Sequence, residues 1–221
     1  MNYSGIVAGL KANYTKEQLK YYDLIVEFDF LKLASMGHND TEGYQIFTPD
    51  FIVKDMCAAV GDDIFDFTKN VLEPASGDGA FTVYILGKRL EKALAGGNFE
   101  IDSLKALSTI YSIEMDEELI VKQRSNIFTL YKQFIKKHSI ELSNDYFDFV
   151  RCVILSNFMW AMFNDDSDTQ SMALFNGEVD IAFAMPNAEK NKKGDKYLLM
   201  PVWDITDNDI KVQEEGVEQQ W

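Results

Sequence analysis

A glycine-containing turn is the segment of this sequence best suited to bind a small ligand. It reads Glu73-Pro74-Ala75-Ser76-Gly77-Asp78-Gly79-Ala80-Phe81 and lies between a short apolar run and a helical pattern. Glycines in such a turn let the backbone approach a ligand closely, and the first N–H groups of the following helix face the same space. We expect the acidic side chain of Glu73 to bind a ligand ammonium group and the loop to wrap an amino-acid moiety.

The spacing of this turn excludes the two commonest phosphate-binding patterns. A phosphate loop of the type GxxxxGK[ST] is absent, because Arg89 follows Gly87-Lys88. The dinucleotide pattern GxGxxG is also absent, because Thr82 occupies the position of its last glycine. A purely structural strand-to-helix turn is the alternative interpretation.

A second acidic position follows the next apolar run, Tyr111-Ser112-Ile113-Glu114-Met115-Asp116. In doubly wound sheets, an acidic residue at the end of the second strand accepts hydrogen bonds from both ribose hydroxyls. Glu114 has that place, and Met115 could pack against an adenine ring. Taken alone, Glu114 would equally suit the solvated start of a helix.

Hydrophobic periodicity indicates the elements that must position these residues. It predicts helices at 15–36, 48–60, 80–95 and 116–138, and strands at 70–74, 108–115, 149–155 and 179–185, with a possible fifth at 197–203. This alternation predicts βαβ units and a parallel sheet with helices on its faces. The acidic segment 204–221 should be a mobile tail.

Composition restricts the classes of function. With 221 residues, 47% of them hydrophobic, the chain can form one good-sized domain. The net charge is 21 − 36 = −15, which disfavours direct DNA binding, so we expect DNA contact only weakly or through a partner.

The sequence also predicts neither disulfides nor a metal site. Cys57 and Cys152 are too few and too far apart for a disulfide framework or a cysteine zinc site, and His38 and His138 form no paired metal spacing. No membrane span or signal peptide is evident. We therefore expect a cytoplasmic protein without metal, acting with a protein partner or as a homo-oligomer.

In several ordered segments the chain resembles the S-adenosylmethionine-dependent N6-adenine DNA methyltransferases of restriction-modification systems, in their gamma order. Glu73–Phe81 is similar to their motif I and Tyr111–Asp116 to motif II, while Phe47–Met56 resembles motif X. The segment Leu155-Ser156-Asn157-Phe158 lies where motif III offers an acceptor to the adenine amine. The resemblance implies a Rossmann-like methyltransferase sheet, mostly parallel and truncated, with an N-terminal helical segment. It implies three parts: an N-terminal helical segment at 1–43, a methyltransferase-like α/β domain at 44–203 and an acidic tail at 204–221. The resemblance also implies a cofactor site. In it, S-adenosylmethionine is bound by Thr48, Glu73, Ala75, Ser76, Gly77, Asp78, Gly79, Phe81, Glu114, Met115 and Asn157. From the residue type alone, Asn157 would instead be a loop or cap residue.

The catalytic motif of that family departs from its pattern here. The family carries Asn/Asp-Pro-Pro-Tyr/Phe, whose polar group holds the adenine N6 and whose aromatic ring stacks on a flipped base. This chain has Met185-Pro186-Asn187-Ala188, so Pro186 is kept and Asn187 is the candidate for the polar role. The expected target-recognition domain is also missing. The resemblance therefore implies methyltransferase activity that is impaired or dependent on a partner. The alternative is a catalytically inactive acidic module that acts through protein contacts, as a DNA mimic or an anti-restriction factor.

Overall fold

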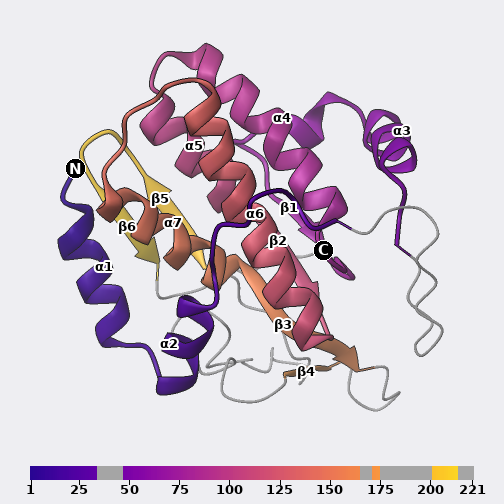
Figure 1. Ribbon diagram of the computed structural model, residues 1–221, viewed down its shortest axis with the longest axis horizontal. Coiled ribbons are helices and arrows are strands. Elements are labelled where there is room, and N and C mark those ends of the chain that lie inside the picture. The colour runs from indigo at the N-terminus through magenta and orange to yellow at the C-terminus, as the bar shows by residue number, and fades with distance from the viewer. Residues whose placement is uncertain (34–46, 165–170, 175–200, 214–221) are drawn as a thin grey trace, which may run out of the picture.

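The computed structural model describes residues 1–33, 47–164, 171–174 and 201–213. Figure 1 shows their arrangement, in which helices predominate over short strands. The helices are α1 (Tyr3–Ala12), α2 (Lys16–Asp23), α3 (Asp50–Val60), η1 (Asp62–Phe65), α4 (Ala80–Gly96), α5 (Phe99–Ser108), α6 (Glu117–Lys137) and α7 (Asn144–Asn157). The strands are β1 (Val71–Glu73), β2 (Ile110–Glu114), β3 (Phe158–Asn164), β4 (Ser171–Leu174), β5 (Val202–Ile205) and β6 (Ile210–Gln213).

A small sheet with the strand order β1-β2-β3-β4 lies at the centre of the fold. β1 pairs with β2 in parallel, with Glu73 opposite Ser112, and β2 pairs with β3 in parallel, with Glu114 opposite Trp160. β4 is antiparallel to β3. Because β1 and β2 run in the same direction, the turn after Glu73 and the residues after Glu114 emerge at the same edge of the sheet. The prediction of a mixed α/β chain with a parallel sheet is confirmed for these strands.

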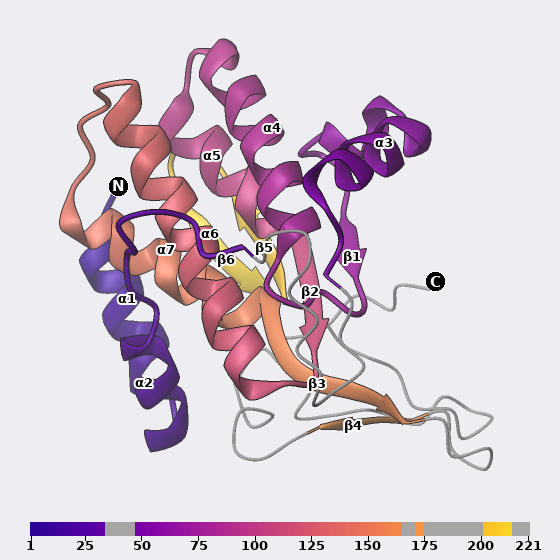
Figure 2. The same ribbon diagram turned by 45° about the vertical axis from the view of Figure 1, so that its right-hand side comes forward.

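Two long helices pack beside the sheet. α6 lies against β2 and β3 and next to α4, as Figures 1 and 2 both show.

Two fully buried arginines form hydrogen bonds between the helices and the residues around the strands. The Arg89 guanidinium donates to the carbonyls of Ile64 and Lys69 and to Thr109 Oγ1, and Arg124 donates to the carbonyl of Phe158. Burial lowers the pKa of Arg89 to about 10. These hydrogen bonds join α4 to η1 and to the residues just before β1 and β2, and they join α6 to Phe158 at the start of β3.

Five elements are confirmed close to their predicted bounds: α3, β1, α4, β2 and α6. The predicted strand at 149–155 is wrong, because these residues form the second half of α7 and the strand begins only at Phe158. Apart from Arg151 the segment is apolar, because α7 packs against α1, α5, α6 and the sheet at once. A continuous apolar run of this kind does not distinguish a buried helix from a buried strand.

The predicted helix at 15–36 is also wrong in length. α2 ends at Asp23, and residues 24–33 continue as an extended strap along α6. Side chains of α6 bind the backbone N–H groups of the strap: Ser125 Oγ accepts from Val26, and Thr129 Oγ1 accepts from Phe28 at 2.8 Å. The apolar spacing in this region therefore reflects a strap that packs on a helix. Two further helices, α1 and α5, were not predicted.

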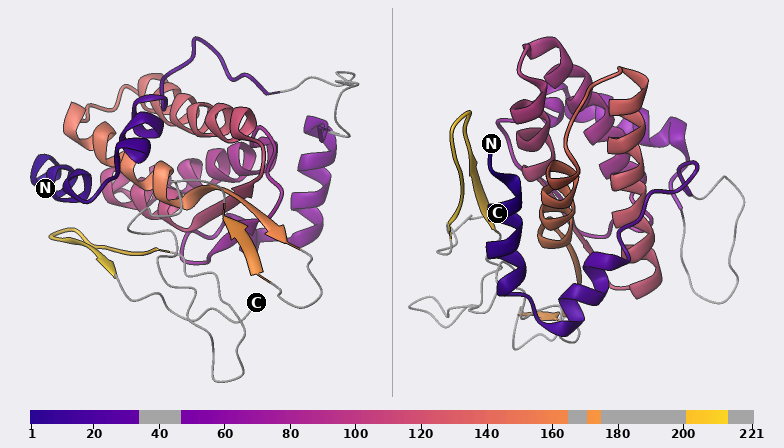
Figure 3. Two further views of the ribbon diagram at one scale, coloured as in Figure 1. Left: turned by 90° about the horizontal axis from the view of Figure 1, so that it is seen from below. Right: turned by 60° about the vertical axis from the view of Figure 1, so that its left-hand side comes forward.

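The expectation of a mobile tail from residue 204 is wrong for its first part. β5 and β6 form an antiparallel hairpin, in which Trp203, Ile205 and Ile210 are buried. Figure 3 places this hairpin on the opposite side of the helices from α3. The Trp203 ring meets Phe149 edge-on, with ring centroids 5.6 Å apart, and its Nε1 donates to Asn157 Oδ1 at 2.9 Å. The predicted strand at 179–185, the catalytic candidates Pro186 and Asn187, and His38 lie outside the described residues.

No helix within the described ranges has the length and apolar character needed to cross a membrane.

The Asn157 amide should be the main polar anchor of the hairpin and of β2. It also donates to the carbonyls of Ser108 and Ile110, at 2.8 and 3.1 Å. We expect Asn157→Ala to lower the free energy of unfolding by about 2–4 kcal/mol, because three buried polar groups lose their partner. Trp203→Phe, which removes the indole donor and part of the buried ring, should cost at least about 1–2 kcal/mol. Urea denaturation of both variants and of the double variant measures the coupling. Strictly additive losses would contradict a direct Asn157–Trp203 contribution.

Candidate functional site

The turn after β1 and the end of β2 are joined by several hydrogen bonds. The Ser76 backbone N–H and hydroxyl both donate to the carbonyl of Ile113, at 3.0 and 3.2 Å. The Gly77 backbone N–H donates to Glu114 Oε2 at 2.7 Å, and the Asp116 N–H donates to Glu114 Oε1 at 2.9 Å. Only 8% of Glu114 is exposed. A carboxylate offers about four acceptor positions, so two remain after these bonds. The two segments singled out in the sequence thus form a single site at the carboxyl edge of the sheet.

The turn itself needs glycine at two positions. Gly77 has a φ of 56° and Gly79 a φ of 93°, both in the left-handed region. A Cβ atom at Gly79 would lie only 2.6 Å from Gln123 Cγ, whereas one at Gly77 would meet nothing closer than Phe47 Cε1 at 4.0 Å. Gly79 is therefore required for packing against α6, while Gly77 is open on the side of Phe47.

Gln123 of α6 is fully buried and forms hydrogen bonds with the turn. Its Oε1 accepts from the hydroxyls of Ser76 and Ser112, at 2.9 and 3.1 Å, and its Nε2 donates to Thr82 Oγ1 at 3.0 Å. One amide side chain therefore joins β2, the turn and the first part of α4. Such a satisfied buried network makes the turn rigid.

Two further residues of α6 bind Asp78. The side chain of Asp78 is buried, and its Oδ2 pairs with Lys122 Nζ at 3.2 Å. The backbone carbonyl of Asp78 accepts from Asn126 Nδ2 at 3.0 Å. Lys122 Nζ also lies 5.8 Å from the centre of the Phe47 ring. This places the segment that resembles motif X, and with it the half-buried Thr48, beside the turn.

Asn126 also connects the turn to the N-terminal strap. Its Oδ1 accepts the backbone N–H of Lys32 at 2.8 Å, while its Nδ2 binds the carbonyl of Asp78. The side chain is completely buried and both of its polar atoms are used. The strap and the turn are therefore coupled through a single amide.

Glu73 is a carboxylate that the fold only partly stabilises. It is half-buried at the end of β1, and the burial raises its pKa, while a hydrogen bond from the Ala75 backbone lowers it by less. Burial also raises the pKa of the nearby Cys57 thiol, and the Glu73 charge adds to that effect. A half-buried carboxylate of raised pKa beside an open turn is suited to bind a cation, which would restore its charged form.

The structure brings most of the predicted site residues together, with one exception. Ala75 is exposed on the turn, Phe81 is half-buried in the first turn of α4, and 63% of Met115 is exposed next to Glu114. Asn157 is instead the last residue of α7, directly before β3, and its amide binds the carbonyls of Ser108 and Ile110 near the start of β2. It is fully buried there and has no access to the edge that holds Glu114. The loop-or-cap alternative describes Asn157 better than a ligand contact.

Lys122, Gln123 and Asn126 were missed by the sequence analysis. The sequence does contain one sign of these residues: Gln123–Asn126 is a run of four polar residues within a long amphipathic helix. All four of its residues are buried. Polar residues on the core side of a helix need partners, so this run indicates a face that binds other backbone segments. Among the described residues, no group of three or more His, Cys, Asp or Glu side chains could hold a metal ion.

The two glycines of the turn should differ in their tolerance of alanine. Gly77→Ala should cost about 1–2 kcal/mol of stability, because a Cβ is strained at positive φ. Gly79→Ala should cost clearly more, because its Cβ also overlaps Gln123. Gly87→Ala is a matched control within α4, where the new Cβ has only an ordinary contact with Leu130 Cδ2 at 3.9 Å. It should be neutral or stabilising. Urea denaturation ranks the three variants, and equal losses at Gly77 and Gly79 would contradict the packing argument.

Glu73 should make stability depend on pH. Because its pKa is raised in the folded state, ionisation of Glu73 disfavours folding, and this cost appears as the pH rises through that pKa. Glu73→Gln does not ionise, so it should be more stable than the parent chain at pH 7 and equally stable below about pH 4. Thermal unfolding at several pH values measures the difference. Glu141→Gln, at an exposed position, is the control and should show no such trend. A difference that persisted at low pH would indicate another cause.

Comparison with known proteins gives no relative: no protein-family model matches the chain, and neither a curated protein nor a solved structure is detectably similar to it.

Proposed function

We propose that this chain is an S-adenosylmethionine-binding, methyltransferase-like protein of the N6-adenine DNA methyltransferase family, with catalysis that is impaired or dependent on a partner. The observation that carries the proposal is the contact of the Gly77 N–H with Glu114. It joins a glycine turn to an acidic strand end at one edge of a parallel sheet. Ligands of open α/β sheets bind at the carboxyl ends of the strands, where nucleoside-binding folds place these two features.

The strand order supports a Rossmann-like sheet. Read from β3 to β1, the parallel strands follow the order 3-2-1, which is the order of one half of a doubly wound nucleotide-binding fold. α4 connects to β1 through the glycine turn, so the N-terminal N–H groups of α4 face the site.

The residues present fit the proposed cofactor. Glu73 would bind its ammonium group, since burial leaves this carboxylate short of positive partners. The turn from Ala75 to Gly79 would surround the amino-acid portion. The two free acceptor positions of Glu114 would take the ribose hydroxyls, with Met115 exposed beside them for the adenine ring. Bound there, S-adenosylmethionine supplies an activated methyl group.

The motif that should hold the target base is altered in this chain, which is why catalysis should be impaired or dependent on a partner. Met185 does not accept a useful hydrogen bond from an amine, and Ala188 does not stack on a base. Loss of stacking alone costs about 1–3 kcal/mol of base binding. Asn187 is the remaining polar side chain next to Pro186 that could serve the reacting nitrogen.

Titration calorimetry with S-adenosylmethionine tests the proposal. The parent chain should bind, and Glu114→Gln should bind about tenfold more weakly, because one amide oxygen replaces two carboxylate oxygens that are shared between the turn and the ligand. Glu118→Gln, an exposed acid in the first turn of α6, is the matched control and should bind like the parent. Absence of binding by the folded parent chain would refute the proposed function.

The net charge of −15 favours a second candidate, an inactive acidic module that occupies the basic groove of a DNA-binding protein. The two candidates differ in turnover. A methyltransferase should transfer labelled methyl groups to DNA once its partner is present, and the repaired variant Met185→Asn, Asn187→Pro, Ala188→Tyr should increase that transfer. The acidic module should show no transfer in either form and should bind its basic partner less tightly as salt rises.

A further inference from the structure

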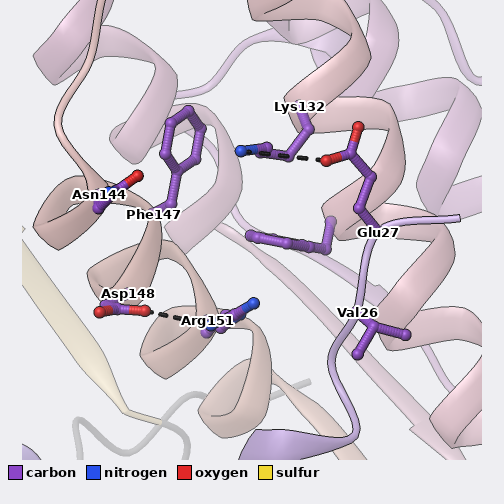
Figure 4. Close-up of a pocket in the computed structure, with 8 residues that line it drawn as sticks. Val26, Glu27, Lys132, Asn144, Phe147, Asp148 and Arg151 are labelled. Atoms are coloured by element: carbon purple, nitrogen blue, oxygen red, sulfur yellow. Dashed lines mark hydrogen bonds and ion pairs between the residues drawn. The ribbon is translucent and has the colours of Figure 1, made fainter.

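A separate hollow lies away from the candidate site, between α6, α7 and the strap. It has a volume of about 240 Å³. Phe128 and Lys132, one helical turn apart on α6, form one wall, and Phe147 and Arg151, one turn apart on α7, form another. Figure 4 shows Asn144, Phe147 and Asp148 on one side, facing Val26 and Glu27 of the strap on the other.

Two aromatic rings hold the cations of this hollow in place. Lys132 Nζ lies 4.0 Å from the centre of the Phe147 ring, and the Arg151 guanidinium lies 4.8 Å from that of Phe128. The two rings meet edge to face with centroids 6.5 Å apart. The hollow thus combines an apolar surface with two cations held over aromatic rings, each of which also faces an acidic side chain, Glu27 or Asp148.

The cations have more donors than the described part of the protein uses. Lys132 and Arg151 carry eight N–H donors together, three on the ammonium and five on the guanidinium. Lys132 forms an ion pair with Glu27 at 3.9 Å, and Arg151 donates a hydrogen bond to Asp148 at 3.1 Å and also interacts with the Tyr22 hydroxyl. Arg151 Nε is buried without a partner among the described residues. Asp148 in turn already accepts from the Tyr22 hydroxyl as well as from Arg151.

We propose that this hollow binds a small carboxylate with an apolar body. The carboxylate accepts from Lys132 and Arg151, for which guanidinium and ammonium donors are suited, and the apolar part lies against Phe128 and Phe147. An amine is disfavoured, because Lys132 and Arg151 already pair with Glu27 and Asp148 and would repel a further cation. An anion instead can use the N–H donors of the two cations that these pairs leave over. The volume lies below the 300–1,000 Å³ typical of drug-sized ligands, which favours a compact free acid.

Titration of the full ¹⁵N-labelled chain with sodium phenylacetate, followed by NMR, tests this proposal. We expect saturable shifts confined to the amides of the strap, the middle of α6 and α7. Phenethylamine has the same ring with the opposite charge and should bind at least tenfold more weakly. Lys132→Gln should weaken phenylacetate binding about tenfold, whereas Lys136→Gln, one turn further along α6 and exposed, should leave it unchanged.

Two results would overturn the proposal: the absence of saturable shifts with phenylacetate, or equal affinity for phenethylamine. Arg151→Gln provides a second variant on the other wall and should also weaken binding about tenfold. Should that variant unfold, Lys132→Gln still decides the outcome, because its ammonium lies at the surface edge and 29% of its side chain is exposed. Equal phenylacetate binding by Lys132→Gln and Lys136→Gln would also count against the site.

Discussion

The carboxylate of Glu114 is the contact on which the candidate site depends. It accepts two backbone N–H groups, one from the turn after β1 and one from the start of α6. Both groups belong to residues that directly follow a strand. A charge-assisted bond to a backbone N–H is stronger than a neutral one, especially where only 8% of the acid is exposed. The separation of β1 and β2 therefore sets the distance that this one side chain must span.

Side chains of α6 also fix the position of the turn after β1. Its residues Lys122, Gln123 and Asn126 bind the side chain of Asp78, the hydroxyl of Ser76 and the carbonyl of Asp78. Buried polar groups are costly unless each finds a partner, and here the partners are the turn itself. The turn and the helix thus satisfy each other, so the site is largely preformed before any ligand binds.

The sequence predicted the turn after β1 and the end of β2 close to where they lie, whereas it misassigned residues 15–36 and 149–155. Glu73, Gly77, Gly79 and Glu114 could be placed because a strand end, a glycine turn and a second strand end are local patterns with a fixed geometric relation in parallel sheets. The strand assigned at 149–155 failed because this part of α7 is buried apart from Arg151, so its sequence shows no polar face with a helical period. The expected role of Asn157 depended on the same strand. A strand at 149–155 would have placed Asn157 at its carboxyl end, whereas β3 begins at Phe158 and Asn157 lies before it. The roles of Gln123 and Asn126 depend on which backbone segments lie opposite α6, which is information about tertiary contacts and not about spacing.

The polar residues of α6 also limit which insertions and deletions the chain can accept before this part of the helix. Ser125, Thr129 and Asn126 bind the strap, while Lys122, Gln123 and Asn126 bind the turn, so two adjacent stripes of one helix are matched to two different chain segments. Each residue of an α-helix advances by about 100°, given 3.6 residues per turn. Insertion or deletion of a single residue before position 122 would rotate both stripes away from their partners together. The length of the connection between Glu114 and Lys122 is therefore far less free to vary over evolution than the loops at the opposite end of the helix.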